Sequence, residues 1–362
     1  MPTEKIQKLV HWYEKRLAPV AFLAGFVFDT LTLTRADLLQ DNLIMLSHIA
    51  LSAFAILAFY AYESGKTLGG LLTKVAHLLP VLMQFSFGAL FSGFVVLYFR
   101  SGTFAADWSF LAVLVFLLVG NEFFRERYRR LAFRLSLYFA ALFFYAIFAV
   151  PTALGRIGAD IFLLSGMVSL AAAAIFVFIL TLISRSGFYE HKARIFAGIG
   201  GVYFVLNLMY FANVIPPIPL ALKRLGVYHS VEKISGGNYK VLFEKAPWYQ
   251  PWLDAGTVFH WQKGEALFAF SAVFAPAEID TRISHHWLYF DPVEKRWVEK
   301  LVAAFPIIGG RDFGYRGYTL VRSVEPGDWR IEVRTERGQL LGRSTFTVVE
   351  SDAPPALEVR EY

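Results

Sequence analysis

Seven long apolar runs constrain this chain more than any other feature of its sequence. A helix needs about 20 apolar residues to cross roughly 30 Å of hydrocarbon, and an open strand cannot satisfy its backbone groups there. The runs therefore predict a transmembrane bundle of about seven α-helices. They cover residues 17–34, 43–61, 80–98, 108–124, 133–151, 160–183 and 195–215.

Composition supports lipid as the solvent for the first part of the chain. The sequence is 56% hydrophobic and only 18% charged, whereas about a quarter of the residues in soluble domains are charged. Residues 1–224 carry 19 Lys and Arg against 11 Asp and Glu, and residues 225–362 carry 16 against 18. Because the second part lacks a compact basic patch, we expect no nucleic-acid partner.

The distribution of Lys and Arg predicts the orientation of the helices. If residues 1–16 are cytoplasmic, the inner segments hold 14 basic residues, and the short outer loops hold only Arg35, Arg100 and Arg156. The positive-inside rule favours this orientation, and seven crossings then place the C-terminal domain outside the membrane. We therefore expect a bacterial inner-membrane protein with its C-terminal domain in the periplasm. The first apolar run lacks a cleavage site and is interpreted as a retained anchor.

The pattern changes after the last apolar run. Three prolines in residues 216–219 favour a stiff linker, assigned to 216–227. Short alternating runs separated by turn signals then predict an all-β, immunoglobulin-like antiparallel sandwich over 228–350, followed by a flexible tail at 351–362. The expected strands are 239–243, 257–261, 267–274, 284–290, 297–303, 318–324, 329–334 and 344–349.

Several motifs in this second part resemble a bacterial family known as domain of unknown function 2914. They include His285-His-Trp-Leu-Tyr289, Tyr318-Thr-Leu-Val-Arg-Ser323 and Pro326-Gly-Asp-Trp-Arg-Ile-Glu-Val333. The membrane part is similar to the multi-helix region of some members, at Gly25-Phe-Val-Phe-Asp29 and at the proline-rich exit. The resemblance implies a membrane-anchored periplasmic β domain, and it brings no catalytic residues with it.

Polar residues within or beside the apolar helices are the first candidate site, because ionisable groups are costly in lipid. In the expected topology they lie near the outer surface of the membrane. In one interpretation Asp29 pairs with Arg35 or His48 and holds the first two helices together. In the other, the group lines an outward-open pocket for a lipid head group, an ion or a proton. The candidates are Asp29, Arg35, Asp37, His48, Asn207 and Asn213.

In the β domain, alternation places His285, Trp287 and Tyr289 on one face of a strand, with His286 and Leu288 on the other. If exposed, this stripe suits stacking on a sugar or a partner; the alternative is that it is buried in the core. The four histidines of the domain, His229, His260, His285 and His286, show no His-x-His or His-x-x-x-His spacing, and the chain has no cysteine. We therefore expect no metal and no cofactor.

Two classes of function fit these features. The first is a non-enzymatic anchor, scaffold or sensor in contact with membrane lipids, whose β domain binds an envelope protein or glycan. The alternative is a transporter, or a membrane enzyme acting on a lipid-linked substrate, that uses the polar residues around Asp29 and His48. The sequence contains no nucleophile elbow, P-loop or dinucleotide fingerprint, which favours the first class.

Overall fold

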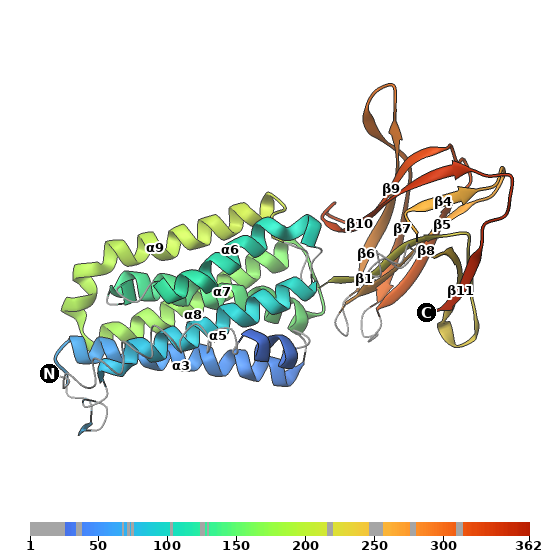
Figure 1. Cartoon of the computed structure of the whole chain (residues 1–362). Helices are drawn as coiled ribbons and strands as arrows, with labels where there is room; N and C mark the ends of the chain where they lie inside the picture. The colour runs from blue at the N-terminus through green and yellow to red at the C-terminus, as the bar shows by residue number, and fades with distance from the viewer. Residues whose placement is uncertain are drawn as a thin grey trace. The chain divides into compact units, whose positions relative to one another are not determined.

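A computed structural model describes most of the chain, and two compact units divide it (Figure 1). One unit is helical and lies within residues 1–215, and the other is a β unit that includes residues 216–362. The described residues are 26–33, 38–66, 69–70, 73, 76–101, 104–123, 127–128, 130–215, 220–245, 256–275, 280–308 and 314–362.

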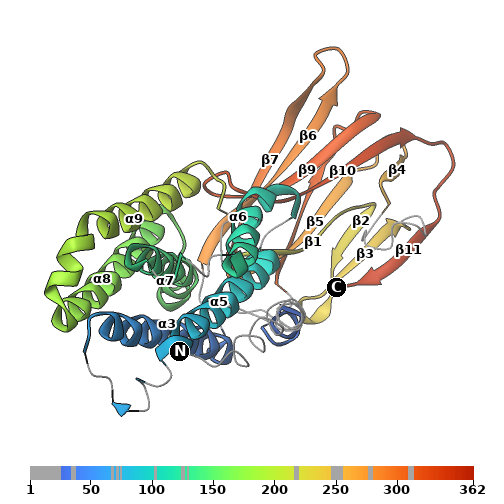
Figure 2. The same ribbon diagram turned by 60° about the vertical axis from the view of Figure 1, so that its left-hand side comes forward.

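Long apolar helices form the first unit and run side by side in Figures 1 and 2. A short helix at residues 26–32 precedes them. Their cores are rich in aromatic rings, such as the contact of Tyr98 with Phe148 at 4.4 Å between centroids. The long helices are α3 (Leu39–Glu63), α5 (Leu79–Ser101), α6 (Phe104–Phe123), α7 (Leu131–Leu154), α8 (Ala159–Ile183) and α9 (Arg185–Phe211).

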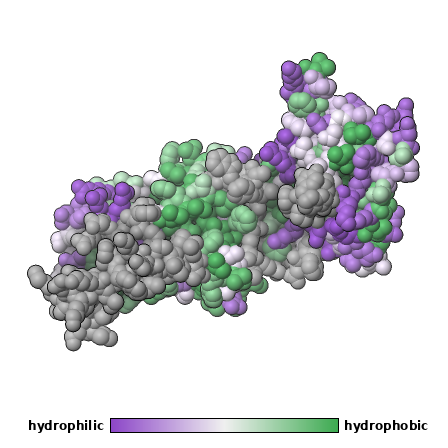
Figure 3. All heavy atoms as spheres, in the orientation of Figure 1, coloured by the Kyte–Doolittle hydropathy of each residue, from purple (hydrophilic) through white to green (hydrophobic). Residues whose placement is uncertain are grey.

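Five of these helices, α3, α5, α7, α8 and α9, are long and apolar enough to cross a membrane. The sixth, α6, has a shorter apolar stretch at Phe110–Asn121. Large apolar side chains point outward from them, including Phe178 on α8 and Phe204 on α9. Figure 3 shows such side chains gathered on the visible face of the helical unit, whereas much of the β unit is hydrophilic. The chain is therefore a membrane protein. Of the first expected span, 17–34, only residues 26–33 are described.

The last helix begins earlier than its apolar run indicates. The sequence predicts a span at 195–215, but α9 starts at Arg185. Ser184 precedes it as the N-cap and accepts a hydrogen bond from the backbone N–H of Gly187 at 3.4 Å. Consequently Lys192 and Arg194, two of the 14 basic residues assigned to the inner segments, lie on the first turns of this helix.

Eleven strands in the described part of the β unit form three sheets. The sheet orders are β1-β5-β8, β4-β10-β9-β6-β7 and β11-β3-β2. Their bounds are β1 (Ala221–Tyr228), β2 (Ser230–Lys233), β3 (Tyr239–Glu244), β4 (Val258–Trp261), β5 (Leu267–Phe274), β6 (Asp280–Asp291), β7 (Arg296–Ile308), β8 (Tyr315–Val321), β9 (Gly327–Thr335), β10 (Leu340–Glu350) and β11 (Leu357–Glu361).

Strand β5 explains how the three sheets stack. It reads as an almost continuous apolar run, which is typical of a strand buried on both faces. Leu267 and Ala269 pack with Trp287 and Trp329 of the five-stranded sheet. Residues 270 and 272 on the other face pack against the small sheet that contains β3. The sheet β1-β5-β8 is therefore a middle layer.

Three details correct the fold predicted from the sequence. Strand β4 pairs in parallel with β10, so the five-stranded sheet is not purely antiparallel. The expected linker, 216–227, contains most of β1, because Ala221–Tyr228 pair with β5; residues 216–219 lie outside the described chain. The expected flexible tail, 351–362, contains β11, which pairs with β3 from Leu357 to Glu361.

Candidate functional site

The structure brings two of the expected intramembrane polar residues together. Asp29, in the helix at 26–32, is close enough to His48 of α3 to interact electrostatically, and it also approaches the hydroxyl of Ser92 on α5. Neither His48 Nδ1 nor Ser92 Oγ has a hydrogen-bond partner among the described residues. The approach of Asp29 to His48 fits either interpretation, a staple between helices or a polar pocket, and both remain predictions.

The other members of this group have local roles or are not described. Asn207 donates a hydrogen bond to the carbonyl of Tyr203 one turn earlier in α9, at 2.8 Å. Asn213 has a positive φ of 56° directly after α9, the left-handed conformation in which asparagine commonly ends a helix. Arg35 and Asp37 lie outside the described residues. We find no site that joins Asn207 or Asn213 to Asp29 in the described part of the bundle.

The expected aromatic stripe of the β domain faces the core. His285 and Trp287 are fully buried, and Tyr289 is half-buried with its ring 5.3 Å from that of Trp329. Alternation along β6 was therefore predicted correctly, and the buried alternative is the one that the structure shows. Since His285 and Trp287 have no solvent-exposed surface, they do not form a stacking platform for a sugar.

A cluster of two histidines and two glutamates was missed by the sequence analysis. His229 is hydrogen-bonded through Nδ1 to Glu265 at 2.6 Å and through Nε2 to Glu244 at 3.1 Å. Glu244 also bonds His260 Nδ1 at 2.6 Å. Burial alone lowers the pKa of His229, but its bonds to the two carboxylates outweigh this effect and raise the pKa above its usual value. No local sequence pattern indicates this cluster, because its members come from separate strands and turns.

Electrostatics show that this cluster is an ion-pair network. Burial raises the pKa of Glu244, but hydrogen bonds from His229, from His260 and from the backbone N–H of His260 outweigh it, so the net pKa is lowered. Both ring nitrogens of His229 face carboxylate oxygens, an arrangement that favours the doubly protonated ring. No group of three or more residues in the described chain is placed to hold a metal ion.

The most accessible candidate surface is the outer face of the five-stranded sheet. We define it as the side chains of β6, β7, β9 and β10 that alternate with the core residues, together with Val258 of β4. Sheet β1-β5-β8 packs against the opposite face. Among the described side chains, four arginines lie on the outer face, namely Arg282, Arg330, Arg334 and Arg343, against three acidic residues, Glu299, Asp328 and Glu332.

The three acidic residues already have partners. Asp328 accepts a hydrogen bond from the hydroxyl of Thr347 at 2.7 Å. Glu332 accepts hydrogen bonds from the guanidinium of Arg334, one of them at 2.9 Å from Nε. Glu299 is bonded to His286 Nδ1 at 2.6 Å. Among the described side chains, the arginines of this face therefore outnumber its carboxylates by one.

Arg330 is the most constrained cation on the outer face. Its guanidinium carbon lies 4.0 Å from the ring centroid of Trp297, which in turn contacts Phe290. Its Nε is buried and has no hydrogen-bond partner among the described residues. Burial, followed by the nearby charge of Arg343, lowers the pKa of Arg330. The carboxylate of Glu332, 3.8 Å from Nη1 of Arg330, opposes these two effects on the pKa.

Comparison with known families identifies the part of the chain that forms this face. Residues 280–348 match a family described as "Protein of unknown function (DUF2914)". The C-terminal part of the chain carries a DUF2914 domain. The matched residues include β6, β7, β8 and β9 and nearly all of β10. The DUF2914 domain thus supplies four of the five strands of the sheet and all four arginines of its outer face.

Similarity to other proteins is remote. No curated protein matches the chain. Among solved structures, an immunoglobulin-like protein from Pseudomonas aeruginosa matches with 14% identity and a TM-score of 0.23, covering 36% of this chain and 96% of that one. A β-glucosidase from Listeria innocua matches with 14% identity and a TM-score of 0.21, covering 34% of this chain and 16% of that one.

A third match is the alkylpurine DNA glycosylase AlkC from Pseudomonas fluorescens, with 11% identity and a TM-score of 0.23, covering 85% of this chain and 99% of that one. TM-scores this low carry no functional inference.

The apolar helices and the family match together show that the chain is a multi-pass membrane protein with a C-terminal β domain that includes DUF2914.

Proposed function

We propose that this protein presents its β domain in the periplasm of a bacterial cell and binds an acidic envelope glycan through the outer face of the five-stranded sheet. The helices anchor it in the inner membrane. We also propose an immunoglobulin-like architecture for the five-stranded sheet and the sheet β1-β5-β8, which pack face to face. The observation that carries it is the group of four arginines on the outer face, above all Arg330, whose buried Nε has no hydrogen-bond partner among the described residues.

The chemistry of the outer face favours a glycan over a protein. Protein interfaces are centred on apolar or aromatic side chains that become fully desolvated. Among the described residues, the exposed large apolar side chains on this face are the scattered valines Val258, Val302 and Val349. The rings of Phe290 and Trp297 are only partly exposed, and Arg330 covers that of Trp297. Serine, threonine and arginine side chains surround them. Such a surface offers charge-assisted hydrogen bonds to the carboxylates or phosphates of an acidic sugar chain.

Binding to a polyuronate tests the proposal. Full-length protein in lipid nanodiscs is expected to bind polygalacturonate, with an affinity that falls as salt is added, and not to bind neutral dextran. Each charge-assisted hydrogen bond contributes about 1.5–3 kcal/mol. Replacing both Arg330 and Arg343 by Gln should therefore weaken binding at least tenfold.

Arg322→Gln is the matched control, because this exposed arginine follows β8 and lies off the outer face. Equal binding by the double variant and the control would refute the proposal. So would equal binding of dextran, or capture of a protein that does not depend on Arg330 and Arg343.

Topology requires a separate test. Reporter fusions at Leu220 and Tyr362 should be active with alkaline phosphatase and dark with green fluorescent protein, because only the former folds productively in the periplasm. The reverse result would place the β domain in the cytoplasm and exclude an envelope glycan as its ligand.

A further inference from the structure

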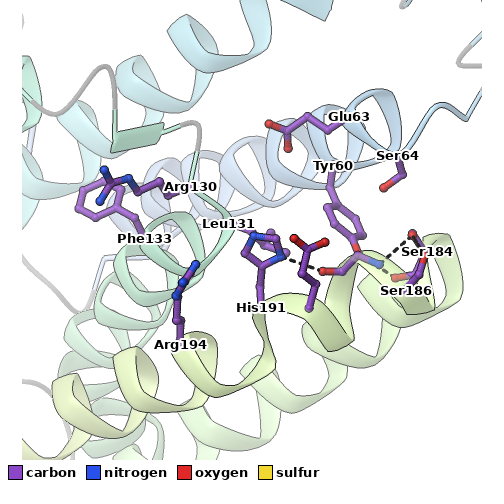
Figure 4. Close-up of a pocket in the computed structure, with 13 residues that line it drawn as sticks. Tyr60, Glu63, Ser64, Arg130, Leu131, Phe133, Ser184, Ser186, His191 and Arg194 are labelled. Carbon is purple, nitrogen blue, oxygen red and sulfur yellow. Dashed lines mark hydrogen bonds between the residues drawn. The ribbon is translucent and has the colours of Figure 1, made fainter.

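A cavity of about 990 Å³ opens at one end of the helical unit (Figure 4). Its walls come from the last turn of α3, the start of α7, and the junction of α8 with the first turns of α9. These are ends of membrane-length helices. The cavity therefore lies at the level where lipid head groups meet water.

One wall of the cavity is fixed by hydrogen bonds between distant parts of the chain. The hydroxyl of Tyr60 donates to the carbonyl of Ser184 at 2.7 Å and so joins α3 to the start of α9. Gly187 allows this approach, because a Cβ at that position would lie 2.9 Å from the hydroxyl of Tyr60. His191 Nδ1 is hydrogen-bonded to the carbonyl of Gly187 at 3.1 Å.

One of the two glutamates that line the cavity, Glu63, forms an ion pair with a buried arginine. Glu63 lines the cavity, and its carboxylate lies 2.6 Å from Nη2 of Arg134, whose side chain is only 1% exposed. The guanidinium of Arg134 also packs over the ring of Phe59 at 4.9 Å. Because Arg134 compensates its charge, Glu63 repels an anion in the cavity only weakly.

Two arginines supply the available positive charge. Arg130 and Arg194 lie on the same side of the cavity in Figure 4, and both are exposed. In the described part of the chain neither forms an ion pair. Glu190, one turn before Arg194, is the remaining charged residue in the lining.

Lipid lies beside this cavity if the helices span a membrane. The exposed apolar side chains Leu182 and Phe196 flank it along α8 and α9. Tyr189 is exposed on the same turn as Glu190, with the ammonium of Lys192 5.1 Å from its ring centroid. Tyrosine and lysine at a helix end are typical of the membrane–water interface.

We propose that this cavity binds a phosphate group, held by Arg130 and Arg194, and that a membrane phospholipid head group carries it. The volume admits a whole head group. Glu190 disfavours a second negative charge, so a phosphate diester with one charge fits better than inorganic phosphate. The hydroxyls of Tyr60 and Ser186 lie on the opposite wall, where they face the rest of the head group.

Native mass spectrometry of the full-length protein in detergent tests this proposal. Dihexanoyl phosphatidylglycerol is expected to bind, and dihexanoylglycerol, which lacks the phosphate, is not. Replacing Arg130 and Arg194 together by Gln should reduce the bound fraction at least tenfold. Arg185→Gln is the matched control, because Arg185 begins the same helix but does not line the cavity.

A second variant keeps the proposal testable if the double variant fails to fold. Glu190→Gln should increase the affinity for the phospholipid several-fold, because it removes the repelling charge. Binding of inorganic phosphate alone, with the same dependence on the two arginines, would confirm the phosphate site and reject the lipid as its source. Equal binding of dihexanoylglycerol, or no change in either the double variant or Glu190→Gln, would overturn the proposal.

Discussion

His285 Nε2 lies 2.7 Å from the hydroxyl oxygen of Ser271, between the five-stranded sheet and the middle sheet of the β unit. Nδ1 of the same ring lies 2.9 Å from the hydroxyl of Thr319, which also accepts a hydrogen bond from Nε1 of Trp287. Hydroxyl groups bond either tautomer of a neutral imidazole. The ring is therefore satisfied without a charge, and it links two sheets through an otherwise apolar core.

Ser271→Ala should destabilise the β unit by about 1–3 kcal/mol, because it leaves a ring nitrogen of His285 buried without a partner. Tryptophan fluorescence during urea unfolding provides the measurement, since six of the eight tryptophans lie in residues 225–362. Ser284→Ala serves as the control, because Ser284 is on the outer face of the sheet. An equal effect of both substitutions would contradict the proposed link between the sheets.

The stability of the β unit should also fall in mild acid because of His285. Burial, together with the neighbouring His286, lowers the pKa of His285 from 6.5 to about 3. Because the folded pKa is below the unfolded one, the contribution is fully present above pH 6.5 and is lost as the pH falls toward 3. At pH 5 the loss is roughly 2 kcal/mol, at 1.36 kcal/mol for each pH unit. His285→Gln should flatten this part of the stability profile; an unchanged slope would exclude His285 as its cause.

His229 should have the opposite pH dependence. Its folded pKa is raised, so its contribution is present below pH 6.5 and is lost as the pH rises through the folded value. Glu265→Gln removes one carboxylate and should reduce stability at pH 6 more than at pH 9, measured by the same fluorescence transition. Glu358→Gln is the control, because its ion pair with Lys245 is exposed and such pairs contribute at most about 1 kcal/mol. A pH-independent effect of Glu265→Gln would count against an ion pair at His229.

The C-terminal residues should contribute to stability. Tyr362 exchanges two backbone hydrogen bonds of 2.9 Å with Tyr239, and its ring stacks 5.5 Å from that of Phe270. Removing residues 357–362 leaves β3 without a neighbour on that side and should lower the unfolding temperature by several degrees, at about 2–4 °C for each kcal/mol lost. Val359→Thr, at an exposed position of β11, should change it little. An unaltered melting temperature after truncation would support the flexible tail that the sequence predicts.

Asp29 distinguishes the two interpretations of the intramembrane polar group. If Asp29 staples helices through its interaction with His48, Asp29→Asn should lower the thermal stability of the detergent-solubilised protein by an amount equivalent to about 1 kcal/mol. If the group lines a pocket, stability should be unchanged or higher, because a costly charge has been removed from an apolar region. Thr30→Ala, at the next and exposed position, provides the control.

The sequence by itself determined the elements of this protein. A run of about 20 apolar residues has one stable conformation in lipid, so α8 was predicted almost to its ends. Strict alternation is typical of a half-buried strand, and the strand predicted at 284–290 lies within the longer β6. The start of α9 was predicted less accurately. Its first turns, which follow the N-cap Ser184, are polar, so the apolar run did not include them. The order of the strands in the sheets could not be predicted, because pairs such as β4 with β10 join residues far apart in the chain.

Only the tertiary structure decided the polar sites. Tyr60 and Ser184 are 124 residues apart, and the cavity that they help to shape has no local signature. The same is true of His229 with Glu265 and of Ser271 with His285. The membrane-length helices and the strands of the β domain thus follow from local periodicity, because each element buries its own apolar face. The charged outer face, the ion-pair network and the cavity arise only when those elements pack, since hydrogen bonds and ion pairs depend on distances between side chains that no local pattern sets.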